Sequence, residues 1–221
     1  MSSRWRLLPL LLSLPGLLAL PGCFSGLNNK APLRQRYVLQ PPPPGPASPA
    51  ATAVATAVAP AGALQVLRPT AAPGLAGEGI AVLRPGARLD FYGNARWAAD
   101  APAALQSLAI ERLRAAGRFA TVESEGGPFA SQYLLSLDLT HFEARYGAEG
   151  PPTIEVELVA SLGRRSDRTL IVTVTAHSTV RAEADRMQSV MAAFEQATGE
   201  VLAQLTASIG PVSGAATAPT Q

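Results

Sequence analysis

A single cysteine is the residue of this chain best placed to do chemistry. Cys23 follows Leu20, Pro21 and Gly22, the order of leucine, small residue and cysteine found in a bacterial lipobox. Its thiol can accept a diacylglyceryl group, Gly22 lets a signal peptidase approach the backbone, and Leu20 fills an apolar subsite. Cleavage between Gly22 and Cys23 would make the cysteine the first residue of the mature chain, where two or three acyl chains anchor a protein stably.

The segment before Cys23 has the composition of an export signal. Arg4 and Arg6 form a short cationic region, and an almost continuous apolar run of about 14 residues follows, from Leu7 to Leu20. A run of this length is too short for a bilayer core, which needs about 20 residues. We therefore predict a removed signal peptide and a protein tethered to a membrane through Cys23. The alternative is an unmodified cysteine that happens to follow a signal peptide.

The other reactive residue types do not form a catalytic pattern. Asp138 and His141 lie three apart in a predicted strand, so we expect them on opposite faces. Glu155 and Glu157 share a face, as on any solvated strand, and His177 lies among threonines. With one cysteine and two histidines, the chain cannot form a multi-cysteine zinc site. These patterns predict a protein that is not an enzyme and uses no metal or cofactor.

The glycine-rich stretch from Gly74 to Gly79 loosely resembles a phosphate-binding loop. No Lys-Ser or Lys-Thr pair follows it, and no helix starts there to hold an anion. We therefore interpret it as an ordinary loop.

Charge argues against a nucleic-acid partner. The 18 basic residues are nearly balanced by 16 acidic ones, and Arg4 and Arg6 are lost with the signal peptide. The mature chain is then close to neutral and lacks the basic surface that phosphate backbones require. For the same reason, we expect binding to any protein partner to depend only weakly on salt.

Composition divides the chain into four parts. Residues 1–22 form the signal peptide, and 23–63 contain the lipidated N-terminus, a short strand at 37–39 and a segment rich in proline and alanine. That segment is uncharged from Gln40 to Ala63 and contains four consecutive prolines, a composition typical of an extended linker or a long loop. It is either a spacer that extends the protein's reach or an insertion without a role. Residues 64–210 form the folded domain, and 211–221 form a disordered tail.

The domain's hydropathy pattern predicts an α+β fold, a mostly antiparallel sheet with two amphipathic helices packed against it. A period of two with one polar face indicates half-covered strands, and a period near 3.6 indicates helices. The predicted strands cover 64–67, 80–83, 88–92, 118–122, 133–140, 154–161 and 170–177, and the helices cover 100–117 and 184–209. Asp100 is the predicted N-cap of the first helix.

The order of these motifs resembles the ABC-type transport auxiliary lipoproteins, including the paraquat-inducible protein C type. After the lipidated cysteine, that family has a Tyr-x-Leu strand, matched by Tyr37 and Leu39. An aromatic residue and a Trp-Ala pair lead into its first helix, matched by Tyr92 and Trp97. For Trp97, the sequence leaves open whether it packs between hairpin and helix or contacts a partner.

The resemblance implies a non-enzymatic component of a lipid transport system of the mammalian-cell-entry type. The implied partners are a mammalian-cell-entry domain protein and its ABC permease and ATPase. The implied location is the periplasmic face of the outer membrane, consistent with Phe24 rather than an aspartate after Cys23. Homo-oligomerisation is left open, and a free edge of one of the shorter strands is the expected docking surface. The alternative function is a stand-alone envelope lipoprotein that binds an apolar ligand or regulates a cell-wall enzyme.

Overall fold

The computed structural model describes residues 34–42 and 62–209. The predicted signal peptide, Cys23, most of the segment rich in proline and alanine, and the tail at 211–221 lie outside these residues. The described elements are β1 (Gln35–Tyr37), β2 (Leu64–Val66), β3 (Thr70–Ala71), β4 (Gly79–Arg84), β5 (Arg88–Trp97), α1 (Ala101–Ala115), β6 (Val122–Ser124), β7 (Tyr133–Arg145), β8 (Thr153–Arg164), β9 (Leu170–Arg181) and α2 (Met187–Ser208).

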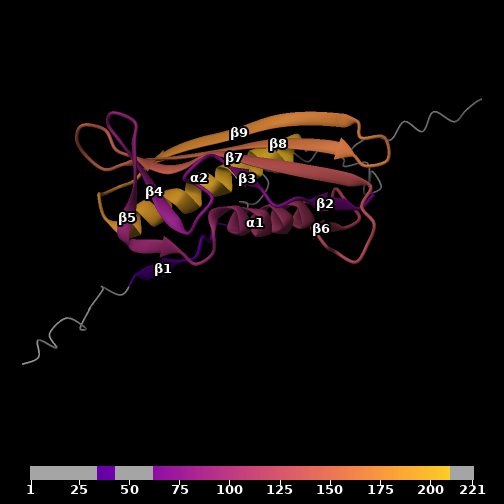
Figure 1. The fold of residues 1–221 in the computed structure, drawn as a ribbon, viewed down its shortest axis with the longest axis horizontal. Helices are drawn as coiled ribbons and strands as arrows, with labels where there is room; N and C mark the ends of the chain where they lie inside the picture. Colours follow the sequence, from indigo (N-terminus) through magenta and orange to yellow (C-terminus); the bar gives the residue numbers. More distant parts are fainter. Residues whose placement is uncertain (1–33, 43–61, 210–221) are drawn as a thin grey trace, which may run out of the picture. The chain divides into compact units, whose positions relative to one another are not determined.

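One mixed sheet contains all nine described strands, with β7 at its centre (Figure 1). On one side of β7, strands β8 and β9 form the expected antiparallel meander. On its other side, β2, β3 and β4 follow one another along its length, and each runs parallel to it. Strand β6 pairs with β2, and β1 pairs with β5, again in parallel.

The prediction of a mostly antiparallel sheet is therefore wrong, although the α+β class is right. The strands β1, β2, β3 and β6 contain two or three residues each. Such short runs carry an apolar pattern but no information on direction, because direction depends on where the chain re-enters the sheet. The β4–β5 hairpin is antiparallel, as the Pro85-Gly86 turn predicts.

A bulge in β7 changes which side chains share a face. The register with β8 shifts between Leu139 and His141, which leaves Thr140 as an extra residue. The buried side chains are therefore Leu137 and Leu139 before the shift but Phe142 and Ala144 after it. Asp138 and His141 consequently lie on the same, outer face, so the expectation that they point in opposite directions is wrong.

Both helices lie on the inner face of the sheet (Figure 1). In α1, the Asp100 side chain accepts a hydrogen bond from Ala103 N at 2.9 Å, which confirms the predicted N-cap and satisfies one free donor of the first turn. The helix α2 covers β8 and β9, while α1 lies beside β2, β6 and α2. No helix among the described residues is long and apolar enough to cross a bilayer.

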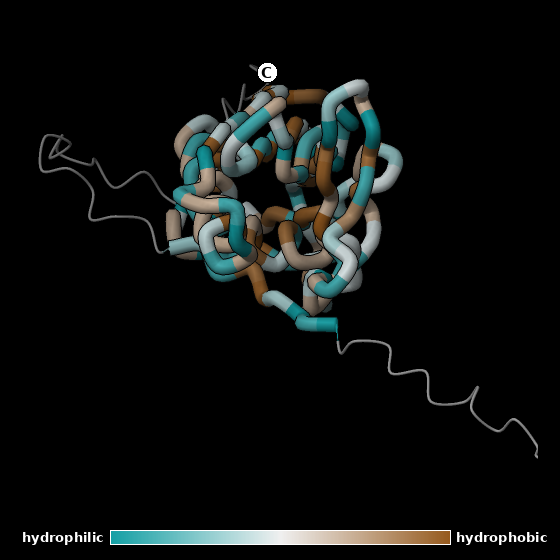
Figure 2. Tube along the Cα trace, turned by 90° about the vertical axis from the view of Figure 1, so that its left-hand side faces the viewer, coloured by the Kyte–Doolittle hydropathy of each residue, from teal (hydrophilic) through white to brown (hydrophobic). Residues whose placement is uncertain are grey.

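The core fills the space between the sheet and the two helices. Apolar and polar residues alternate along the trace in Figure 2, and the apolar ones on the inner face are buried. The largest fully buried side chains come from both layers: Leu64, Ile80, Leu105, Leu113, Leu135, Leu137, Leu139, Ile154, Leu158, Leu162, Phe194 and Leu202.

The first described strand belongs to this same sheet. Residues of β1 pair with Ala95 to Trp97 of β5, and Leu39 is buried in the core. Arg112 of α1 donates hydrogen bonds to the carbonyls of Pro41 and Pro42. The segment rich in proline and alanine thus lies, along the chain, between two parts of the same folded unit, the residues from β1 to Pro42 and the strands from β2 onward. It does not separate Cys23 from the domain, which argues against its interpretation as a spacer.

Candidate functional site

Trp97 lies at the centre of an aromatic cluster. Its ring centroid is 5.3 Å from that of Phe142 and 5.2 Å from that of Phe194, the latter in an edge-to-face arrangement. Only 3% of Trp97 is exposed, and its Nε1 has no hydrogen-bond partner among the described residues. A buried side chain cannot contact a partner, so the geometry favours the packing interpretation.

Two other residues of the family motif, Tyr37 and Leu39, hold β1 in place. The carbonyl of Tyr37 accepts a hydrogen bond from Ala98 N at 2.8 Å. Leu39 is buried beside the Trp97 cluster. These residues attach the N-terminal strand to the junction between β5 and α1.

Tyr92 belongs to a chain of hydrogen bonds between the hairpin and the loop before α2. Its hydroxyl lies 3.0 Å from that of Tyr146, and the Tyr146 hydroxyl donates to Asp185 Oδ1 at 2.6 Å. Burial raises the pKa of Tyr92. Burial and the hydrogen bond to Asp185 also raise the pKa of Tyr146. Both phenols therefore stay neutral near pH 7 and act as structural ties.

A row of charged side chains crosses the outer face of β7, β8 and β9. The Nη2 atom of Arg145 lies 3.3 Å from Glu143 Oε1 and 2.5 Å from Glu155 Oε2. His141 Nδ1 lies 2.9 Å from Glu143 Oε1, and His177 Nε2 lies 3.5 Å from Glu155 Oε1. Burial opposes protonation of His141, but its hydrogen bond to Glu143 and the nearby carboxylates outweigh that effect and raise the pKa of His141.

This row is an ion-pair network rather than a metal centre. One ligand atom each from His141, Glu143 and Glu155 lies within 4.8 Å of the others, a spacing that a cation could use. The guanidinium of Arg145 already contacts both carboxylates, and a cation there would be repelled by it. Glu157 has a separate partner, the Thr140 hydroxyl at 2.7 Å, so Glu155 and Glu157 do not act as a pair.

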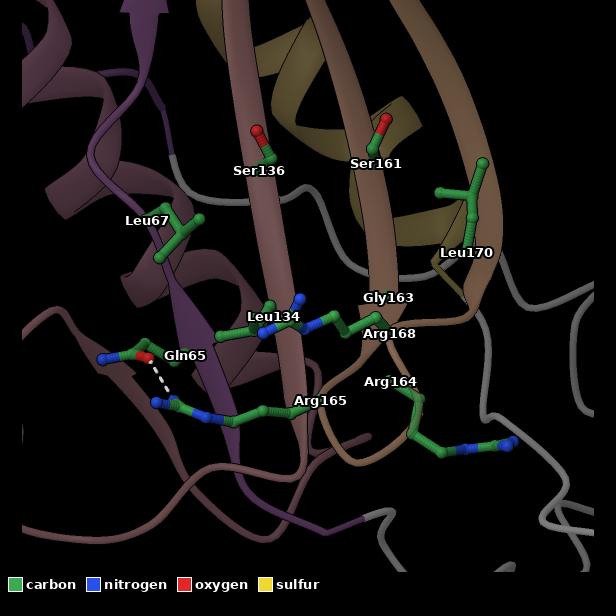
Figure 3. Close-up of a pocket in the computed structure, with 10 residues that line it drawn as sticks. All are labelled: Gln65, Leu67, Leu134, Ser136, Ser161, Gly163, Arg164, Arg165, Arg168 and Leu170. Carbon is green, nitrogen blue, oxygen red and sulfur yellow. Dashed lines mark hydrogen bonds between the residues drawn. The ribbon is translucent and has the colours of Figure 1, made fainter.

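An open groove of about 600 Å³ lies beside the start of β7, whereas the charged row lies near the end of this strand. Figure 3 shows the groove and its lining residues. The turn between β8 and β9 contributes three arginines to it, and neighbouring strands contribute apolar and small polar side chains. The lining residues are Gln65, Leu67, Leu134, Ser136, Ser161, Gly163, Arg164, Arg165, Arg168 and Leu170. We call this feature the arginine groove.

The three arginines of this groove differ in their contacts. Arg165 Nη1 donates to Gln65 Oε1 at 3.0 Å, so its guanidinium points into the groove (Figure 3). Arg164 Nη1 pairs with Asp167 Oδ2 at 3.1 Å. Arg168 has a left-handed backbone with φ of 56° and makes no ion pair with any residue in the described ranges. The turn therefore has an excess of positive charge that the near-neutral total hides.

Strand β9 is a free edge of the sheet, because it pairs only with β8, and the short strands β1 and β6 also have one partner each. Gln204 of α2 binds the backbone of β9 at His177, where it accepts from the N–H at 3.2 Å and donates to the carbonyl at 3.0 Å. This contact occupies the middle of the edge. It interrupts the row of backbone groups that a partner strand would need.

Comparison with known families places these features in context. The family model described as "ABC-type transport auxiliary lipoprotein component" matches residues 37–209. The chain belongs to this family. The match begins at Tyr37, the last residue of β1, and ends at the last described residue, so it extends across the segment rich in proline and alanine.

Two solved structures have the same fold as this auxiliary lipoprotein. Protein XCC0632 from Xanthomonas campestris, of the DUF330 family, is 27% identical with a TM-score of 0.61 and covers 79% of this chain and 90% of its own. A protein of uncharacterised function is 16% identical with a TM-score of 0.61 and covers 80% and 99%, respectively. No curated protein sequence matches the chain.

The arginine groove is the feature that sequence reasoning missed. Its arginines stand in the short run Arg164, Arg165, Ser166, Asp167 and Arg168, which is also a common composition for a solvated turn. The clustered positive charge of this run was the one feature of the sequence that could have indicated a binding surface. The groove's apolar residues Leu67, Leu134 and Leu170 come from three separate segments, and Gln65 of β2 lies 100 residues before Arg165, its partner. No sequence pattern indicates that these segments meet.

Proposed function

We propose that this chain is a lipid-anchored, non-enzymatic subunit of an ABC-type lipid transport system of the mammalian-cell-entry type. In this proposal, Cys23 holds it at the periplasmic face of the outer membrane, and it docks a mammalian-cell-entry domain protein of that system. The observation that carries the proposal is the family match over nearly the whole folded part, residues 37–209. The lipobox at Cys23 supports the anchor.

The site chemistry agrees with a role in binding. The charged groups of the outer face are paired with one another. Of the family-motif residues, Tyr92 is hydrogen-bonded and Trp97 is packed in the aromatic cluster. The arginine groove is open and has charged walls, unlike the enclosed apolar cavity that a lipid carrier needs. Docking is therefore favoured over the alternative of a stand-alone carrier.

The arginine groove is the surface we assign to the protein partner. It combines apolar contacts from Leu67, Leu134 and Leu170 with unpaired positive charge on Arg168, which suits an acidic segment with apolar anchors. The left-handed backbone of Arg168 is a conformation that a non-glycine residue adopts at some cost, and such residues gather at binding sites. Partner binding should then weaken as salt rises, in place of the weak dependence expected from net charge alone.

Two experiments test this proposal. For the anchor, palmitate labelling of the wild-type chain should show incorporation, and Cys23→Ala should abolish it and release the protein from the membrane fraction. An unlabelled wild-type chain would refute lipidation.

For docking, the lipidated full-length chain should recover the mammalian-cell-entry protein from detergent-solubilised membranes. The double variant Arg165→Glu and Arg168→Glu should reduce recovery at least tenfold, while Arg181→Glu, an exposed arginine outside the groove, should leave recovery unchanged. If the wild type recovers no transport component, the transport role is wrong. If the double variant recovers as much as the wild type, another surface docks the partner.

A further inference from the structure

Two of the large apolar side chains exposed on the described residues lie side by side in one hairpin. Leu89 and Phe91 of β5 are 41% and 47% exposed. The other large exposed apolar residues are Val38, which lines a groove beside α1, and Phe129 and Leu170, which lie near the start of β7. Single exposed apolar residues are ordinary, but a group of them on one face indicates a contact surface.

The strand register places this group on one side of the sheet. Leu89 is opposite Leu83, and Phe91 is opposite Ala81. Ala81 in turn is opposite Glu143 on the outer face of β7. The ring of Phe91 lies over Gly79, where an added Cβ would come within 2.6 Å of it. Glycine thus lets the ring lie flat against the backbone.

Arginines surround these apolar side chains. Phe91, Arg96 and Arg34 line one open groove of about 430 Å³, and Arg36 is opposite Arg96 in the parallel register of β1 and β5. Arg84 and Arg88 at the hairpin turn pair with each other in the register next to Leu83 and Leu89, so they point to the other side of the hairpin. Glu78 is the acidic side chain that pairs with Arg36 and Arg96. The hairpin face, defined here by Leu89, Phe91, Arg34, Arg36 and Arg96, therefore has an excess of positive charge.

The hairpin face is also the part of the domain closest along the chain to Cys23. β1 starts at Gln35, and an extended chain spans at most about 3.6 Å per residue, so the cysteine is within about 43 Å of β1. The segment rich in proline and alanine lies after β1 and adds nothing to this distance. An acyl anchor on Cys23 would keep this face near the bilayer.

We propose that the hairpin face rests on the phospholipid surface that holds the anchor. Leu89 and Phe91 enter the boundary between headgroups and acyl chains, and the surrounding arginines contact lipid phosphates. This inference rests on the lipidation in the proposed function and adds an orientation to it. The arginine groove, at the far end of β7, then points away from the membrane toward the transport partner.

Site-directed spin labelling of the lipidated full-length protein tests the orientation. Acylation blocks the thiol of Cys23, so Leu89→Cys or Phe91→Cys supplies the only free thiol for a nitroxide. Phe129→Cys and Leu170→Cys are matched controls, because both residues are apolar and exposed but lie at the other end of β7. The protein is reconstituted in vesicles of phosphatidylethanolamine and phosphatidylglycerol at a ratio of three to one.

The measured quantity is collision of the nitroxide with oxygen relative to a water-soluble nickel chelate. We expect this ratio to be at least fivefold higher at positions 89 and 91 than at 129 and 170, and to fall toward the control value when Arg34 and Arg96 are changed to glutamate. Equal ratios at all four positions would overturn the inference. A label at 91 shielded from both oxygen and nickel would also overturn it, because it would indicate burial against a second copy of the chain.

This experiment separates the inference from the proposed function. If the wild-type protein does not float with the vesicles, lipidation itself has failed. If it floats and still recovers the transport partner while the labels at 89 and 91 report water, only the orientation is wrong.

Discussion

Replacing Trp97 with alanine should cause a large loss of stability. Truncating a fully buried tryptophan costs about 3 to 5 kcal/mol, and Trp97 is only 3% exposed. Its contacts with the rings of Phe142 and Phe194 add about 0.5 to 1.5 kcal/mol each. Removing its unpartnered Nε1–H returns about 1 to 3 kcal/mol, the usual cost of a buried unsatisfied donor. These two corrections nearly cancel, which leaves a loss of about 3 to 5 kcal/mol.

The variant Trp97→Phe separates packing from the hydrogen-bond deficit. It keeps an aromatic ring against Phe142 and Phe194 and removes the unsatisfied donor. The void that it leaves is smaller than the void left by alanine. We expect the free energy of unfolding to change by less than about 1.5 kcal/mol, because the relieved donor offsets part of the lost packing. The gap between the two variants then measures the aromatic cluster itself.

Urea denaturation followed by circular dichroism gives the free energies, and thermal melts give an independent check. For a domain of about 150 residues, the alanine variant should melt about 10 °C below the wild type. A loss below 1 kcal/mol for Trp97→Ala, with native secondary structure retained, would refute the packing role. Unchanged stability together with lost recovery of the transport partner would instead make Trp97 a contact residue.

Three further predictions follow from the titratable and hydrogen-bonded groups. Because the pKa of His141 is raised, its contribution to stability is complete below about pH 6.5 and is lost as pH rises through the folded value. His141→Gln should remove this part of the pH dependence in urea melts, and His177→Gln should retain it; identical pH profiles for His141→Gln and wild type would count against it. The hydrogen bond from Arg68 lowers the pKa of Asp100, so Asp100→Ala should cost about 1 kcal/mol at pH 7. Its deficit should shrink in acid, as wild-type Asp100 becomes protonated, and a constant deficit down to pH 2 would contradict this. Tyr146→Phe removes the donor to Asp185 and should lower the free energy of unfolding by about 1 to 2 kcal/mol in the same assay. Unchanged stability would show that this chain of hydroxyl hydrogen bonds does not stabilise the fold.

The long, strongly patterned elements were predictable from sequence. The structure confirms α1 with its Asp100 cap, the β4–β5 hairpin and the β7–β8–β9 meander. The pattern at 118–122 was only partly informative, since Phe119 is buried but the strand β6 starts at Val122. Short elements of this kind depend on the neighbour that they pair with, and local propensity cannot specify it.

The sequence by itself determined the chemistry that needs only neighbouring residues. A lipobox is a local pattern around Cys23, an N-cap acts over three residues, and the alternation of a long strand shows which face is buried. Local interactions of this kind are complete within a few residues of the chain, so they can be read along it.

Only the tertiary structure decided which distant residues meet. Parallel pairing of β2 with β7 brings Gln65 to Arg165, and parallel pairing of β1 with β5 brings Arg36 to Arg96. A one-residue bulge at Thr140 brings His141 to the face that holds Glu155. These arrangements depend on strand direction and register, which are set by how the whole core packs, and a chain read residue by residue contains no local signal for them.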